Sequence, residues 1–258
     1  MSITITAKGV AYNDTTPDVL TSGLITLTTG NTLSVLVGMP DSGDLFEFGN
    51  VTATWNGTPL TLVVFSNAGS AGGLGLFFLH NVTGGTAPVI VTFGLPPSET
   101  VACISEISGL DTPSDHSVGG GTGADTVAGA LNILPNSQAS EIVVGGVTFN
   151  SALSNIASNL NSCVTGQSRD GHTFCIVELY RIHTSIPPTS LIGVNLSVAK
   201  TWESVSADLL GSTDVPVRVS GYTSYSTGRI LDGSPEAQVP PEVGQRIARG
   251  DRRFMGQG

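Results

Sequence analysis

The chain has 258 residues, of which only 12% are charged, and its formal net charge is −10. This length suffices for one large β-sandwich or two small domains with a substantial core. Helix formers are scarce while Thr, Ser, Val, Gly and Asn are plentiful, which argues against a helical body and predicts strands joined by turns.

The charge is unevenly distributed. Up to Ser168 the only cation is Lys8, against eleven carboxylates, whereas from Arg169 onward nine cations meet nine anions. Binding of the acidic part to nucleic acid is not expected, because phosphate contact needs a basic face. Four cations lie in the last thirteen residues: Arg246, Arg249, Arg252 and Arg253. Arginines can form bidentate pairs with carboxylates, so we predict that these four contact a neighbouring copy. The alternative, that they only solvate the chain end, stays open.

The first eight residues alternate like a strand and lack the basic start and apolar stretch of a signal peptide, so we expect assembly in the cytoplasm. Without an apolar run of about eighteen residues, no membrane-spanning segment is predicted. Residues 33–37 predict a strand, and the polar loop 40–50 leads to another at Val51–Trp55. Asn56-Gly57 then predicts a tight hairpin turn into Leu60–Phe65, because both central residues of such a turn need positive φ.

Further strands are predicted wherever apolar or β-branched runs are bounded by Gly, Pro or Asn: Gly75–Leu79, Val89–Phe93, Val101–Ile107, Ile142–Phe149, Thr173–His183 and Leu191–Val198. Strands in this number predict an all-β fold, specifically an antiparallel two-sheet β-sandwich of jelly-roll-like type over residues 1–211.

A Gly-rich segment between Ser114 and Asp125 interrupts this series of strands. It contains Gly119-x-Gly121-x-x-Ala124, which resembles a dinucleotide-binding loop only in spacing, because that loop requires a preceding strand and a following helix. We interpret the segment as a flexible linker between two runs of strands. Residues 212–258 are predicted to form an extended C-terminal arm, because they are turn-like and Pro-rich before the Arg-rich end.

No constellation for catalysis is evident. The four histidines are interpreted as surface or loop residues: His80, His116, His172 and His183. Cys103, Cys163 and Cys175 lack metal-ligand spacing; Cys163 and Cys175 could meet across a hairpin, although two free thiols fit a reducing compartment better. Residues 166–171 are expected to form a polar hairpin loop. Asp41, Asp44 and Glu47 could hold Ca²⁺ but are better explained as a solvated loop, so no metal or cofactor is predicted.

Several motifs carry a resemblance to a known class of proteins. Val51-Thr-Ala-Thr-Trp55-Asn-Gly, Leu74–Leu79, Gly84-Gly85-Thr86 with Val89–Phe93, and Ser105–Gly109 follow one another in this chain. This series resembles β-sandwich proteins of tailed bacteriophages over roughly residues 30–205. The resemblance implies a role in capsid decoration or cementing, or in a tail fibre or adhesin, and residues 212–258 have no counterpart in the pattern.

The sequence therefore predicts a non-enzymatic structural protein of a phage particle, a capsid decoration or minor capsid subunit located in the virion. Its expected partners are other copies of itself and other virion proteins, without nucleic acid or membrane. The alternative is a carbohydrate-binding adhesin module, in which Trp55, Tyr180 or Trp202 would stack on a host surface glycan. For both tryptophans, a place in the core is the preferred interpretation.

Overall fold

The computed structural model describes residues 2–40, 50–67, 72–133, 141–160, 163–170, 174–183 and 189–211. Within these ranges the chain forms seventeen β-strands and one short 3-10 helix, η1 (Leu153–Asn155), and every strand pairing is antiparallel. The prediction of an all-β antiparallel sandwich is thus confirmed. No helix in the described ranges is long and apolar enough to cross a membrane.

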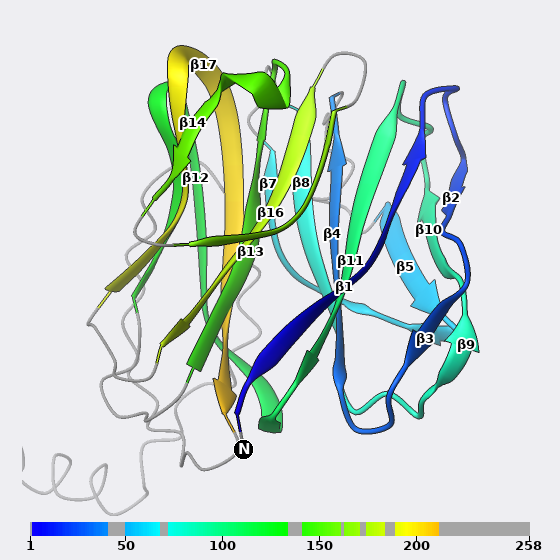
Figure 1. Cartoon of the computed structure of the whole chain (residues 1–258). Helices are drawn as coiled ribbons and strands as arrows, with labels where there is room; N and C mark the ends of the chain where they lie inside the picture. The colour runs from blue at the N-terminus through cyan, green and yellow to red at the C-terminus, as the bar shows by residue number, and fades with distance from the viewer. Residues whose placement is uncertain are drawn as a thin grey trace, which may run out of the picture.

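A five-stranded sheet, here called the central sheet, forms the middle layer (Figure 1). Its strands, in spatial order, are β1 (Thr4–Asn13), β11 (Thr100–Ser108), β4 (Thr32–Met39), β8 (Gly73–Leu79) and β7 (Thr61–Asn67). All eight residues of β4 are buried, because other sheets cover both faces of the central sheet. A strand covered on both faces need not alternate between apolar and polar side chains.

A four-stranded sheet, called the outer sheet, packs on one face of the central sheet. Its strands are β2 (Val19–Thr21), β10 (Val89–Phe93), β5 (Val51–Trp55) and β6 (Thr58–Pro59). The core between these two sheets includes Val35, Trp55 and Val91. A two-stranded ribbon of β3 (Ile25–Leu27) and β9 (Gly85–Ala87) lies at one end.

The second half of the chain forms a further sheet, called the C-terminal sheet, on the opposite face of the central sheet (Figure 1). Its strands are β12 (Leu110–Ile133), β17 (Thr189–Gly211), β13 (Glu141–Phe149), β16 (Cys175–His183) and β15 (Val164–Asp170), and β14 (Ile156–Asn159) pairs with β17. The strand pattern predicted two stacked sheets, and the structure adds this third layer.

The pairing of β12 with β17 is interrupted near its middle. Asp125 faces Lys200, but Val127 faces Asn195, so four residues of β17 lie outside the ladder. Beyond this point the paired strands pack back over β13 and β16, where Ile192 and Val194 join a core with Val147 and Val177. The folded-back part of the β12–β17 pair and the strands β13 and β16 therefore enclose a third core.

The prediction of a flexible linker at residues 114–125 is wrong, because this segment is part of β12. The glycines serve side-chain packing: a Cβ on Gly123 would come within 2.6 Å of the Trp202 ring, and one on Gly121 within 3.3 Å. The expected hairpin loop at residues 166–171 is also corrected, since Val164–Asp170 is the edge strand β15.

The Asn56-Gly57 turn is confirmed, with φ values of 48° and 76° at its two central residues. After this turn, however, only the two residues of β6 continue the pairing with β5, and the chain then crosses to the central sheet as β7. The predicted strand partner at Leu60–Phe65 thus belongs to a different layer from Val51–Trp55.

Candidate functional site

The solvent-facing side of the outer sheet is a candidate binding surface that the strand pairing defines. Strict alternation sends Leu20, Ala53 and Val91 into the core and turns their neighbours outward. The outward residues form two rows across the strands: Val19, Thr92 and Thr52, and then Thr21, Ile90 and Thr54. All six are β-branched and none is charged, and we call this surface the β-branched face.

The β-branched face offers methyl groups and hydroxyls on a rigid, hydrogen-bonded backbone. Four of its residues are exposed and two, Thr54 and Ile90, are half-buried. A partner that covers such a face does not have to remove charged groups from water, which is the most costly part of forming an interface. The chemistry of the face therefore suits contact with another surface rather than a reaction.

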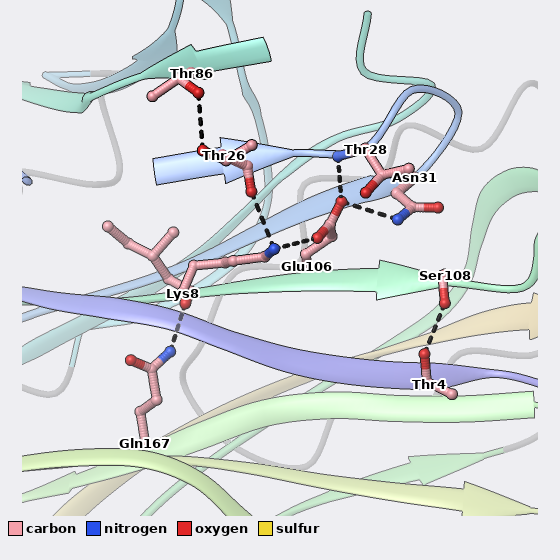
Figure 2. Close-up of polar contacts among 10 residues, drawn as sticks. Thr4, Lys8, Thr26, Thr28, Asn31, Thr86, Glu106, Ser108 and Gln167 are labelled. Carbon is pink, nitrogen blue, oxygen red and sulfur yellow. Dashed lines mark hydrogen bonds and ion pairs between the residues drawn. The ribbon is translucent and has the colours of Figure 1, made fainter. Parts of the chain in front are cut away.

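A network of charged and polar groups joins four segments beside this sheet (Figure 2). Lys8 is the extra residue of a β-bulge in β1, and its ammonium lies 2.5 Å from Glu106 Oε2 on β11. The other carboxylate oxygen accepts hydrogen bonds from the Thr28 backbone N–H, at 2.6 Å, and from Asn31 Nδ2, at 2.8 Å. Lys8 also donates to the carbonyl of Thr26 on β3.

Burial acts to raise the pKa of Glu106, but the Lys8 ammonium and the donors from Thr28 and Asn31 overcome it, so the pKa lies below its usual value. Glu106 is therefore ionised at neutral pH. Both carboxylate oxygens of Glu106 have partners, so the ion pair of Lys8 and Glu106 connects β1, β3 and the turn before β4 to β11. Its geometry indicates a structural clamp.

A second buried carboxyl lies between the central and C-terminal sheets. Glu178 on β16 is fully buried, and its Oε2 accepts hydrogen bonds from Ser105 Oγ, at 2.7 Å, and from Gln167 Nε2, at 3.4 Å. Gln167 also donates to the carbonyl of Ile104, which links β15 to β11. Glu178 Oε1 has no hydrogen-bond partner within the described ranges.

Burial raises the pKa of Glu178 to about 7, although the hydrogen bonds from Ser105 and Gln167 act in the opposite direction. A buried carboxyl with a raised pKa is a candidate acid in a catalytic site. Here its polar partners are one hydroxyl and one amide packed between two sheets. This setting indicates a joint between layers.

The three cysteines are buried free thiols, and Cys163 and Cys175 belong to the same core without forming a disulfide. Burial raises the pKa of all three thiols. Protonated, enclosed thiols are poor nucleophiles, so these cysteines act as small core residues.

The two histidines whose side chains the structure describes each lie within hydrogen-bond distance of a hydroxyl group. The His80 ring nitrogen Nδ1 lies 3.1 Å from Thr32 Oγ1, at the end of β8. His183 was expected at the surface, but it is buried, and its Nε2 lies 2.9 Å from Ser190 Oγ. Burial, and secondarily Arg181, lower the pKa of His183, which favours the neutral ring. The side chains of His116 and His172 lie outside the described set.

The aromatic residues considered for glycan stacking are covered. Trp55 is 1% exposed within the first core, and Trp202 is 7% exposed and donates from Nε1 to Asp125 Oδ1 at 3.0 Å. Tyr180 is half-buried against the core between the central and C-terminal sheets. Both indole rings are therefore core residues, as preferred from the sequence.

The arginines predicted to make assembly contacts lie outside the described ranges: Arg246, Arg249, Arg252 and Arg253. The acidic loop residues Asp41, Asp44 and Glu47 do too. Among the residues that are described, no group of three or more His, Cys, Asp or Glu side chains could hold a metal ion.

Sequence reasoning did not single out the β-branched face or the two buried carboxyl groups. The alternation of residues 51–55 and 89–93 contained the signal for the face, because one set of side chains in each strand is wholly apolar and the other is not. The contacts of Glu178 had no such signal, since its partners lie 11 and 73 residues away in the chain.

No protein-family model matches the chain, and no curated protein matches it. Among solved structures, one match is a crystal structure of a BuGH86 protein in complex with neoagarooctaose, at 10% identity and a TM-score of 0.23. The match covers 80% of this chain but only 33% of that chain, so this chain spans about a third of its length. A TM-score this low supports no conclusion about the fold or function of this chain.

Proposed function

We propose that this protein is a non-enzymatic structural subunit of a bacteriophage particle, of the capsid decoration, cement or minor capsid type. The observation that carries the proposal is the β-branched face, which is uncharged and rigid across three paired strands. Surfaces that join subunits are depleted in charge at their centre. The resemblance of the strand motifs to phage β-sandwich proteins supports the same role.

The interior of the sandwich also fits a structural role. The clamp of Lys8 and Glu106 joins β1 to β11, and the joint of Glu178, Gln167 and Ser105 joins the central and C-terminal sheets. These polar groups contact one another across strands and sheets. The result is a body whose layers are fastened by polar contacts as well as by apolar cores.

In this proposal the C-terminal arm, residues 212–258, provides attachment. The four arginines near its end complement the acidic body, in which one cation accompanies eleven carboxylates up to Ser168. Guanidinium groups on an arm can pair bidentately with carboxylates of a neighbouring subunit.

The test is incorporation into particles. A variant ending at Gly211 should fold, as judged by circular dichroism and a cooperative melting transition, but should not join particles produced with it. A full-length variant with the four terminal arginines changed to lysine is the matched control, because lysine keeps the charge and loses the bidentate geometry. We expect this control to join particles less well than the parent and better than the truncated chain. Unchanged incorporation of the truncated chain would refute the arm, and absence of the parent chain from purified particles would refute the function.

A further inference from the structure

We propose that two copies of this chain pair through the exposed edge of β2, antiparallel and about a two-fold axis, so that their outer sheets join into one continuous sheet. This inference deepens the proposed function by naming a contact between subunits. It rests on the hydrogen-bond pattern of β2, on the apolar residues near it and on the carboxylates at its start.

In the described part of the chain β10 is the one strand that pairs with β2, so that within these ranges the other edge of the β2 backbone is open. The Phe93 N–H donates to the Asp18 carbonyl and the Ser22 N–H donates to the Val89 carbonyl, so residues 18 and 22 bond toward β10. In an antiparallel ladder the bonding direction alternates. Residue 20 therefore also bonds toward β10, and the backbone groups of Val19 and Thr21 point to the open edge.

This arrangement is complementary to itself. When two β2 strands run antiparallel about an axis at Leu20, Val19 of each copy lies opposite Thr21 of the other. Both residues direct their N–H and C=O groups outward, so the two pairs can exchange four hydrogen bonds. Their side chains lie on the solvent side of the sheet in both copies, while Leu20 faces the core. The β-branched face would then continue across the axis without interruption.

The most exposed large apolar side chains that the structure describes lie beside this edge. Leu24 is 74% exposed and follows β2, and Leu95 is 64% exposed and follows β10. Because Phe93 pairs with Asp18, Leu95 lies beyond the start of β2, and Leu24 lies beyond its end. Antiparallel pairing brings the Leu24 end of each copy to the Leu95 end of the other. An exposed edge flanked by apolar residues is a template for pairing with another chain.

The charges favour the antiparallel orientation. Exposed Asp18 immediately precedes β2, and exposed Asp14 lies earlier in the same connection. Antiparallel pairing keeps the acidic ends of the two copies apart, while parallel pairing would bring the aspartates together. A three-residue strand with two leucines buries less than the roughly 800 Å² per partner of a standard interface. The contact is therefore weak by itself and suits repeated use in an assembly.

Cysteine trapping in the purified full-length chain tests the register. A chain carrying both Val19→Cys and Thr21→Cys should form a covalent dimer under mild oxidation, because directly opposite residues in a hydrogen-bonded pair lie about 5.5 Å apart at Cα. The native cysteines are buried and should not contribute. The matched control carries Ile90→Cys and Thr92→Cys, which lie in the same two rows on β10, a strand flanked on both sides. Either single variant of β2 should cross-link much less than the pair.

Sedimentation over a range of protein concentrations gives a second measurement that needs no oxidation. Val19→Lys should weaken self-association about tenfold or more, because it places a lysine against the partner strand, while Thr92→Lys in the same row should have little effect. The proposal would be overturned if the double-cysteine variant of β2 cross-linked no more than the double-cysteine variant of β10. It would also be overturned if the two lysine substitutions weakened self-association equally. Both measurements use isolated protein. If neither measurement detects pairing through β2 but the protein is found on particles, this pairing is refuted and the proposed function stays in place.

Discussion

Replacing Glu178 with glutamine should stabilise the protein, and by an amount that depends on pH. The carboxyl is fully buried, and burial raises its pKa from 4.5 to about 7. The folded state therefore holds this proton more tightly than the unfolded state does. The contribution of Glu178 to stability is complete below pH 4.5, decreases as the pH rises through 7, and is constant above that.

The size of the effect follows from the difference between the two pKa values. A shift of about 2.5 units corresponds to about 3 kcal/mol at pH 8.5, and to less than about 1 kcal/mol at pH 5. Glutamine is neutral at every pH, has nearly the same shape, and its carbonyl oxygen can still accept hydrogen bonds from Ser105 and Gln167. The variant should thus nearly equal the parent at pH 5 and exceed it by about 3 kcal/mol at pH 8.5.

Urea unfolding of both proteins at half-unit steps from pH 5 to 8.5 measures this difference, because contributions from all other groups cancel between parent and variant. Glu178→Leu is a useful companion, since it is also neutral but cannot accept the two hydrogen bonds. It should be less stable than the glutamine variant by a constant amount at all pH values. A stability difference between parent and glutamine variant that does not change with pH, or a glutamine variant less stable than the parent at pH 8.5, would refute the reasoning.

Three further outcomes follow from the structure. Glu106→Gln should show the opposite behaviour, because the pKa of Glu106 is lowered. The substitution should reduce the free energy of unfolding, measured in urea, by on the order of 2 kcal/mol at pH 7, and this reduction should become smaller as the pH falls below 4.5. Gly123→Ala should lower stability by about 1–3 kcal/mol, because the added Cβ would meet the Trp202 ring at 2.6 Å, whereas Gly120→Ala, with its nearest contact at 3.5 Å, should change the melting temperature little. The three buried thiols should react with a thiol reagent only after unfolding, and immediate labelling of any of them in the native protein would contradict their placement in the cores.

The agreement between the predicted and the observed bounds of β5 shows what local sequence information can supply. Val51–Trp55 alternates between core and solvent, and its bounds agree with the prediction from the sequence. The Asn56-Gly57 turn that follows was equally predictable, because only a few residues tolerate positive φ at both central positions. Strands with one solvated face and tight turns depend on neighbours in the chain, so their signals are local.

The same reasoning failed where the environment of a strand is set by distant segments. The glycines of β12 resembled a linker because a Gly-rich run has no alternation, yet they are required where the strand passes the Trp202 ring, some eighty residues away in the chain. The sequence predicted a strand at residues 33–37, but it did not show that two sheets would cover both faces of β4 and bury all eight of its residues.

By itself, the sequence determined that this protein is built from antiparallel strands, because the alternation of side chains and the turn residues are properties of short segments. Only the tertiary structure decided how many layers those strands form, that Glu178 is enclosed between two of them, and that β2 lies at the edge of its sheet among the described strands. Each of these features depends on pairings between residues far apart in the chain, and a single sequence pattern does not specify such pairings.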